Sequence, residues 1–250
     1  MAQLDQITAF LKQELQWERY DDYCPNGLQV QGQAQVHRLV SGVTACEALI
    51  DAAIERGAHA ILVHHGLFWK GDAYPVIGVK RRKLAKLLEH NISVWGVHLP
   101  LDDHPILGNN AQWAARLGWQ VSEQRFGPGN LGWLGSLPNP CELDQVARDI
   151  ETLTQRKPLV IEGRQRPIQR VAWCTGAAQR MIESLDLQRV DLYVSGEVSE
   201  PTFHFAKENG IAFIAAGHHA TERYGVQAVG EKISHEFGLI HEFVDIENPV

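Results

Sequence analysis

Residues 36–66, with the sequence VHRLVSGVTACEALIDAAIERGAHAILVHHG, decide the predicted fold of this chain. Arg38–Val43 has the apolar pattern of a strand, Cys46–Arg56 has the periodicity of a helix closed by Gly57, and Ala60–Val63 is a short buried strand. The alternation continues, which predicts an α/β fold with mostly parallel or mixed sheets covered by helices. Further strands are expected at Ile92–Val97, Val171–Cys174, Leu192–Val194 and Ile211–Ala215, and further helices at Lys80–His90, Asn110–Arg116, Leu143–Thr154, Gln179–Leu187 and Phe203–Glu208.

This segment resembles a second one, IQRVAWCTGAAQRMIESLDLQRVDLYVSGE at 168–197. Strand, helix and strand follow in the same order without a gap, and His65 stands opposite Glu197. Next, EHNISVWGVHLPLD at 89–102 parallels KENGIAFIAAGHHATE at 207–222, so a histidine follows the third strand of each series. We therefore predict an internal duplication. The alternative is that any two α/β segments look alike at this level.

A stretch rich in glycine and proline, RFGPGNLGWLGSLPNP at 125–140, interrupts the alternation and is the best candidate for a boundary or an insertion. The predicted organisation is a first α/β half at 1–123, a connection with a helix at 124–166, and a second α/β half at 167–250. A chain of 250 residues is long enough for two such halves.

Composition excludes several classes of protein. The net charge of -7 argues against a nucleic-acid surface, since the one basic cluster, Lys80–Lys83, lies on a short predicted helix. No apolar run approaches the roughly 20 residues that span a bilayer. The first 15 residues have the spacing of an amphipathic helix rather than of a signal peptide. Four separated cysteines without a C-x-x-C pair indicate neither a disulfide framework nor a thiolate zinc site, and we expect a cytoplasmic protein.

Three polar clusters follow predicted strands directly. They are His64-His65 after ILV, His98 to Asp102 after SVWGV, and His218-His219 to Glu222 after FIAAG. Binding sites of open parallel sheets gather at these carboxyl ends, because loops meet there and helix N-termini point in. The alternative is that each cluster is a hydrogen-bonded polar cap on its strand.

The spacing within the clusters indicates metal binding. If the chain turns helical after Gly217, His218 and Glu222 lie four residues apart on one face and can reach the same ion. Imidazole nitrogen and carboxylate oxygen suit zinc, manganese or iron, and the order of affinities alone does not choose among them. Adjacent strand residues such as His64 and His65 point to opposite faces, which favours two ions over one.

Five motifs follow one another along the chain: PNGLQV at 25–30, VHHG at 63–66, GVHLPLD at 96–102, GEVSE at 196–200 and AGHHATE at 216–222. Together they resemble the GTP cyclohydrolase I type 2 family, which is also known by its eukaryotic member, a transcription-coactivator-interacting factor. The resemblance runs over nearly the whole chain and implies two interlinked α/β halves, a dinuclear centre of divalent metal ions between them, and a toroidal homohexamer. It implies the metal ligands His64, His65, Asp102, His218 and Glu222, with Glu222 as the bridge.

The resemblance implies hydrolysis, in which metal-activated water opens the guanine ring of GTP. His98, Glu197 and His219 are expected to sit beside the ligands in the site, where they would support the ligands or transfer protons, and Glu197 and His98 are the candidates for proton transfer. The alternative is that these three residues are simply hydrogen-bonded polar groups. No phosphate-binding G-x-x-x-x-G-K-[ST] loop is present, so Lys70 and Lys80–Lys83 are the candidates for triphosphate contacts and Trp69 for stacking on a base. The alternatives are a dinuclear phosphoesterase acting on nucleotides and a metal-binding scaffold without turnover.

Overall fold

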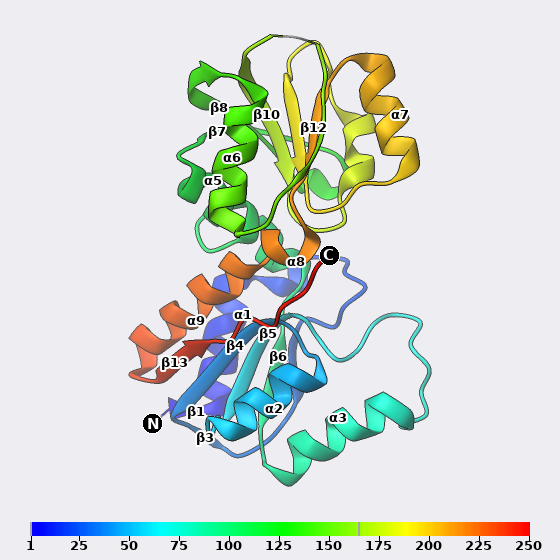
Figure 1. The fold of residues 1–250 in the computed structure, drawn as a ribbon. Coiled ribbons are helices and arrows are strands. Elements are labelled where there is room, and N and C mark those ends of the chain that lie inside the picture. Colours follow the sequence, from blue (N-terminus) through cyan, green and yellow to red (C-terminus); the bar gives the residue numbers. More distant parts are fainter. Residues whose placement is uncertain (1, 165) are drawn as a thin grey trace. The chain divides into compact units, whose positions relative to one another are not determined.

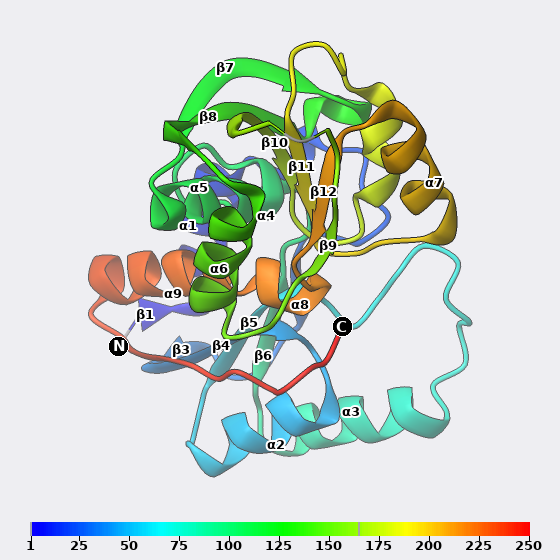
Figure 2. The same cartoon turned by 45° about the horizontal axis from the view of Figure 1, so that its top comes forward.

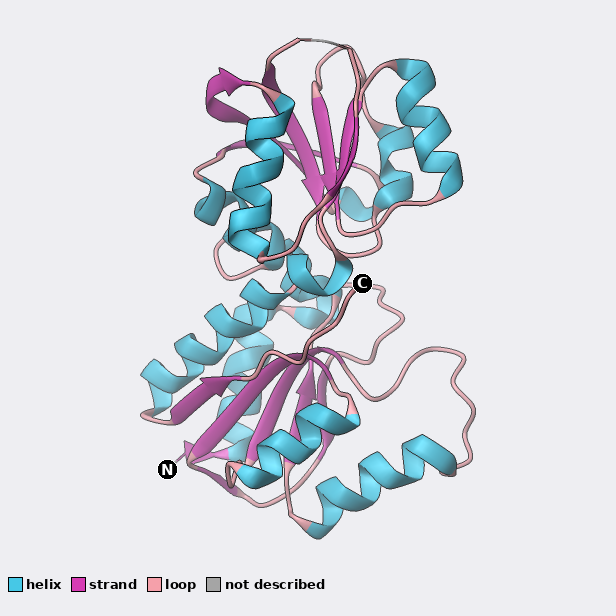
Figure 3. Ribbon diagram, viewed as in Figure 1, coloured by secondary structure: helices cyan, strands magenta, loops and turns pink. Residues whose placement is uncertain are grey.

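The chain forms two compact units in the computed structural model, which describes residues 2–164 and 166–250. Unit 1 runs to Gly108 and includes Arg223–Glu247, and unit 2 consists of Asn109–Glu222 with Asn248–Val250. Each unit is a sheet covered by helices, so the predicted α/β class is confirmed (Figures 1 and 3). Within the described residues, no helix is long and apolar enough to cross a membrane.

Unit 1 is built on a five-stranded sheet in the order β13-β4-β5-β6-β2. The first four of these strands run parallel, and β2 pairs antiparallel with β6 at the edge. The elements of the unit are β1 (Ala2–Gln3), α1 (Leu4–Leu15), η1 (Trp17–Arg19), β2 (Gly27–Val30), β3 (Gln35–Val36), β4 (Arg38–Thr44), α2 (Glu47–Glu55), β5 (Ala60–His65), α3 (Gly78–Glu89), β6 (Ser93–Gly96), α4 (Leu99–Asp103), α9 (Arg223–Phe237) and β13 (Ile240–Phe243).

The pleat of β5 sends alternate side chains into two separate apolar clusters. Leu62 packs in the cluster that contains residues of α1 and α9, whereas Ile61 and Val63 pack in the cluster that contains residues of α2 and α3. Because both faces are covered, the strand is apolar throughout rather than alternating. The alternation does not separate His64 and His65, the last two residues of β5, because the centroids of their rings lie only 4.6 Å apart. The expectation that these two side chains point to opposite faces is therefore wrong at the end of the strand.

Unit 2 is built on a six-stranded sheet in the order β7-β8-β10-β11-β12-β9. Its three central strands, β10, β11 and β12, are parallel and lie side by side in Figure 2. The elements of the unit are α5 (Asn109–Leu117), β7 (Gln120–Phe126), η2 (Pro128–Asn130), β8 (Gly132–Cys141), α6 (Leu143–Thr154), β9 (Leu159–Ile161), β10 (Ile168–Cys174), η3 (Gln179–Ser184), β11 (Leu192–Ser195), α7 (Glu200–Asn209), β12 (Ala212–Ala215) and α8 (His218–Thr221).

The stretch predicted as a boundary is part of the sheet of unit 2 instead. β8 pairs antiparallel with β7 and with β10, and α6 and β9 belong to the same unit. The unit boundaries at residues 108 and 222 therefore differ from the predicted boundaries at 123 and 166. The glycines serve packing rather than flexibility: a Cβ on Gly135 would lie 2.2 Å from the Gln120 carbonyl oxygen and 3.1 Å from the Trp173 ring.

The two units repeat one topology. Each has three parallel strands joined by helical crossovers, and each adds an antiparallel strand beside the third one, β2 in unit 1 and β9 in unit 2. Both antiparallel strands precede the parallel strands in the chain. This is the order that the predicted duplication requires. The repeat is imperfect, because the helix predicted at Gln179–Leu187 is a 3-10 helix that ends at Ser184.

The two halves also exchange segments. After Gly108 the chain passes into unit 2 to form α5 and β7, and after Glu222 it returns to unit 1 to form α9 and β13. β13 completes the sheet of unit 1 by pairing parallel with β4. The chain therefore crosses between units directly after α8 and shortly after α4, the two short helices that carry predicted ligands.

Candidate metal centre

The predicted site residues divide between the units. His64, His65, His98 and Asp102 belong to unit 1, and Glu197, His218, His219 and Glu222 belong to unit 2. Within each unit they follow the carboxyl ends of parallel strands, as the apolar runs predicted.

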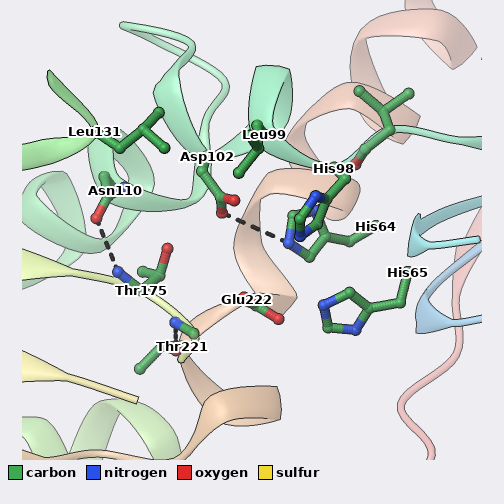
Figure 4. A network of polar contacts seen from close by, with 12 residues as sticks. His64, His65, His98, Leu99, Asp102, Asn110, Leu131, Thr175, Thr221 and Glu222 are labelled. Carbon is green, nitrogen blue, oxygen red and sulfur yellow. Dashed lines mark hydrogen bonds and ion pairs between the residues drawn. The ribbon is translucent and has the colours of Figure 1, made fainter. Parts of the chain in front are cut away.

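His64 is fully buried and held in one orientation. Its Nδ1 lies 2.9 Å from the Val97 carbonyl oxygen, and since a carbonyl only accepts, Nδ1 carries the proton and donates it there. Nε2 is then the nitrogen with the lone pair, and it lies 3.6 Å from Oδ1 of Asp102 (Figure 4). Histidines that bind a metal through one ring nitrogen usually donate the N–H of the other ring nitrogen to a carbonyl or a carboxylate, as His64 does.

His65 lies next to His64 with its ring tilted by 43° and the two ring centroids 4.6 Å apart. Its Nδ1 is 3.1 Å from the hydroxyl of Thr44, which stands opposite it on β4. One ring nitrogen each of His64, His65 and His98 lies within 4.8 Å of the other two, so these three side chains of unit 1 can hold a metal ion.

His98 is positioned by Asp22, which the sequence patterns did not single out. Oδ1 of Asp22 lies 2.8 Å from Nδ1 of His98, and Oδ2 accepts from the backbone N–H of Leu99 at 2.9 Å. Burial raises the pKa of Asp22, but hydrogen bonds from His98 and Asn26 outweigh it and lower the pKa to about 2. Asn26 also accepts from the backbone N–H of His98 at 2.7 Å. Asp22 is therefore an ionised partner that fixes the His98 ring.

Asp102 comes from α4, the short helix that begins directly after His98. Pro100 lies at the start of this helix, where its fixed φ is compatible with the first turn and its missing N–H leaves no donor unsatisfied. The turn buries Asp102, which is only 7% exposed, with its carboxylate toward His64.

In unit 2 the predicted helical turn after Gly217 is present as α8. It places Nε2 of His218 3.2 Å from Oε2 of Glu222, so the two side chains share one face as predicted. Glu197, which follows β11, lies with its Oε1 2.7 Å from Nδ1 of His218. Burial lowers the pKa of His218, but Glu222 and Glu197 outweigh it and raise the pKa to about 9. The two carboxylates thus stabilise positive charge here, which a proton or a metal ion can supply.

Two glycines of unit 2 leave room for these side chains. Gly176 has a φ of +69°, and a Cβ there would lie 2.1 Å from Oε1 of Glu222 and 3.4 Å from Nε2 of His218. A Cβ on Gly196 would lie 2.8 Å from the Cα of His218. The backbone N–H of Gly176 donates to the Thr221 hydroxyl at 3.0 Å, which fixes α8 against the loop after β10. Neither Gly176 nor Thr221 was indicated by the sequence patterns.

The remaining predicted residues have other contacts. The backbone N–H of His219 donates to the carbonyl of Val250 at 3.1 Å, so this residue ties the last residue of the chain to α8. Lys80 donates to the Ala73 carbonyl at 2.8 Å, and Arg82 pairs with Glu47 at 2.7 Å. These two cations of the predicted triphosphate cluster are therefore engaged, whereas Lys70 is exposed.

The donor set fits divalent metal ions. Buried imidazoles and carboxylates without a thiolate are ligands for zinc, manganese or iron, and buried charges of this kind are costly unless a counter-charge compensates them. The space that Gly176 leaves beside Glu222, and the proton position that Val97 imposes on His64, both suit metal ligation. The geometry does not select the identity of the metal.

Comparison with known proteins identifies the family of the chain. The sequence model of the family Duf34/NIF3 (NGG1p interacting factor 3) matches residues 2–249. A Pseudomonas aeruginosa protein is 53% identical over 234 residues, 92% of each chain, and an Escherichia coli K12 protein is 46% identical over 246 residues, 98% of each chain. Both are named GTP cyclohydrolase 1 type 2 homolog.

Solved structures show the same fold. Protein ybgI, described as of unknown function, aligns with a TM-score of 0.95 at 44% identity. A protein from Thermus thermophilus aligns with a TM-score of 0.91 at 33% identity. Each alignment covers 100% of both chains. The resemblance drawn from the five sequence motifs is therefore confirmed over the full length.

Proposed function

The chain belongs to the Duf34/NIF3 family, and from this premise we propose that it is a divalent-metal-dependent hydrolase with a dinuclear centre that opens the guanine ring of GTP. The observation that carries the proposal is the paired arrangement of ligands. Each unit holds one imidazole nitrogen close to one carboxylate oxygen. In unit 1 the distance from Nε2 of His64 to Oδ1 of Asp102 is 3.6 Å, and in unit 2 the distance from Nε2 of His218 to Oε2 of Glu222 is 3.2 Å. The relatives' shared name supports GTP as the substrate to test first.

In this proposal both units supply ligands to the same two ions. Unit 1 contributes His64, His65 and Asp102, and unit 2 contributes His218 and Glu222, with Glu222 bridging. Glu222 suits the bridging role because a carboxylate has lone pairs for two ions, and because it is only 3% exposed. In this proposal His64 would serve one ion and His65 the other, and a ring nitrogen of each lies within 4.8 Å of a ring nitrogen of the other.

Two bound divalent ions would supply Lewis acidity and lower the pKa of water toward neutrality. For GTP, one water adds at C8 of the guanine ring, the ring opens at a carbon–nitrogen bond, and a second water releases formate. Proton transfer falls to Glu197 and His98. Glu197 lies 2.7 Å from a ring nitrogen of His218, and the ring of His98 is fixed by Asp22, so both groups are held in place beside ligands.

The test is a screen of metal-loaded protein against nucleotides in which formate and inorganic phosphate are measured separately. Release of formate from GTP is the expected result, and it should be lost after chelation and in the Glu222→Gln variant. Release of phosphate alone would replace the proposal with a dinuclear phosphoesterase. Absence of both products, with two metals bound and the substrates varied widely, would favour a binding scaffold.

We also propose, from the family resemblance alone, that the chain assembles as a toroidal homohexamer. Light scattering at several protein concentrations should give a mass of six chains of 28.0 kDa each. A monomer over the whole concentration range would refute this assembly.

A further inference from the structure

Two aromatic side chains of unit 1 lie against His98, and one of them also lies against the candidate ligand His65. The ring of Tyr23 has its centroid 4.8 Å from that of His98, and the ring of Trp69 is 5.2 Å from His98 and 5.9 Å from His65. Tyr23 and Trp69 are themselves 5.7 Å apart with ring planes inclined by 34°. Their centroids are too close for a third ring to enter between them, so a ligand ring would stack on an outer face.

These two rings differ in their exposure from the tryptophan in the core of unit 1. Tyr23 is 54% exposed and Trp69 is half-buried, whereas Trp95 of β6 is completely buried in the core. Tyr23 and Trp69 therefore present apolar ring surface to solvent beside the most polar cluster of the unit. Exposed apolar surface next to convergent polar groups is typical of ligand sites.

The backbone holds both rings in place. Trp69 begins a tight turn in which its N–H donates to Oδ2 of Asp72 at 2.9 Å, its carbonyl accepts from the N–H of Asp72 at 3.0 Å, and Gly71 takes a φ of +94°. The N–H of Lys70 in the same turn donates to the carbonyl of Tyr23 at 2.7 Å. The two segments that carry the rings are thus hydrogen-bonded to each other.

The segment of Tyr23 is also bonded to the histidine. Asp22, its neighbour in the chain, accepts from Leu99 and contacts Nδ1 of His98, as described above. The positions of Tyr23, Trp69 and His98 are therefore set by one hydrogen-bonded framework. A surface fixed before binding loses less conformational entropy when a ligand orders on it.

We propose that Tyr23 and Trp69 form an aromatic platform that stacks the purine ring of the substrate beside the metal centre. The proposal rests on the proposed function and adds a feature that selects the substrate class. The platform would favour a substrate with a planar heteroaromatic base over a sugar phosphate alone. Stacking suits this role because a purine offers a π-face to an aromatic side chain whatever its edge substituents. The platform positions the ring, and the histidines and carboxylates carry out the chemistry.

The experiment is a calorimetric titration of the metal-loaded, full-length protein with two probes. One is 7-deaza-GTP, which keeps the planar ring but lacks the N7–C8 double bond that water attacks, and the other is inorganic tripolyphosphate, which has no ring. Trp69→Ala should weaken the binding of 7-deaza-GTP roughly 5- to 140-fold, the range that loss of one stacking contact produces. The binding of tripolyphosphate should stay unchanged.

Matched variants separate stacking from folding. Trp69→Phe keeps an aromatic ring and should restore binding to within about threefold of the wild type, because most of the stacking surface remains. Tyr23→Phe should be neutral and Tyr23→Ala should weaken 7-deaza-GTP binding. The control is Tyr74→Ala, which removes the ring of a tyrosine that follows Trp69 in the chain and is 95% exposed. This change should have no effect on the binding of 7-deaza-GTP. Melting temperature and metal content report the folding of each variant.

The outcomes for the platform are independent of the outcomes for catalysis. The platform would be overturned if the wild type and Trp69→Ala bound 7-deaza-GTP equally. It would also be overturned if Trp69→Ala lost the binding of 7-deaza-GTP and of tripolyphosphate to the same extent. Both conclusions hold whether or not formate is released from GTP. Selective loss of 7-deaza-GTP binding in Trp69→Ala supports the platform even if the wild type releases no formate, in which case the proposed hydrolysis fails and the platform stands.

Discussion

The third parallel strand of each unit is followed by the same local pattern. After β6, His98 directly precedes the short helix α4, which contains Asp102. After β12, His218 is the first residue of the short helix α8, and Glu222 directly follows that helix. In both cases the carboxylate stands four residues after the histidine. Each histidine has a carboxylate at its Nδ1, Asp22 at 2.8 Å for His98 and Glu197 at 2.7 Å for His218. The histidine and the carboxylate four residues on therefore repeat, whereas the partner carboxylates come from different places: Asp22 precedes β2 and Glu197 follows β11.

The second parallel strands differ. β5 ends in His64 and His65, whereas β11 is followed by Gly196 and then Glu197. Unit 1 thus carries mainly imidazole nitrogens, and unit 2 carries carboxylates that raise the pKa of His218 to about 9 by outweighing its burial. Two copies of one topology therefore carry unlike side chains, and the proposed centre would take imidazoles from unit 1 and the carboxylate of Glu222 from unit 2.

The largest expected effect on metal binding follows from changing the bridge. Glu222→Ala should remove or deplete both metals, with affinity lowered more than about 100-fold, because one carboxylate serves both ions. Elemental analysis by mass spectrometry measures the metal content. The matched control is Glu200→Ala, since Glu200 also pairs with a histidine four residues away, His204, at 3.0 Å on an exposed helix. Full occupancy in Glu222→Ala would exclude Glu222 as a ligand.

The next effect separates the two neighbouring histidines. His64→Gln and His65→Gln should each reduce the metal content from two ions to about one, since in the proposal each histidine serves a different ion. His204→Gln, a change on the surface of unit 2, should leave both ions in place. If either ligand variant lost both ions while keeping its melting temperature, His64 and His65 would not divide between two metals.

A smaller effect is expected when the partner of a ligand is changed. Glu197→Gln keeps the shape of the side chain but removes the charge that stabilises the His218 ring, and should weaken metal affinity roughly 10- to 100-fold. Competition with a chelator of known affinity measures the change. An unchanged affinity would show that His218 does not bind metal, or that it needs no support from Glu197.

The smallest effect on metal binding tests the corresponding pair in unit 1. Asp22→Asn removes the charge beside His98, which the proposal places in proton transfer and not among the ligands. Metal content should therefore stay the same while turnover falls roughly 10- to 100-fold. Loss of metal in Asp22→Asn would instead make His98 a ligand, as His218 is in the duplicated pattern.

Much of the fold could be predicted because its parallel strands are buried on both faces. Strands such as β5 and β12 consequently appear as continuous apolar runs, and the polar residues that end them mark the site. The glycine-rich strand β8 was misassigned because its glycines accommodate neighbouring rings, a requirement that composition does not reveal. The exchange of α9 and β13 into unit 1 was also hidden, because periodicity identifies a helix but not the sheet it covers.

The site was predictable where its residues follow strands and not where support comes from distant parts of the chain. Asp22 contacts His98 across 76 positions, and no local pattern links the two. Gly176 was unmarked because its role is the absence of a Cβ beside Glu222. The candidate metal ligands can thus be recognised in the sequence by their residue types and by their places after strands. The residues that position these ligands can be identified only from the tertiary structure.

Anomalous X-ray diffraction from crystals of the metal-loaded protein tests the central claim most directly. The expected result is two metal positions per chain, with His64 and His65 on different ions, Glu222 on both, and ligands from both units. One metal position, bound only by His64, His65 and His98 of unit 1, would contradict the dinuclear centre.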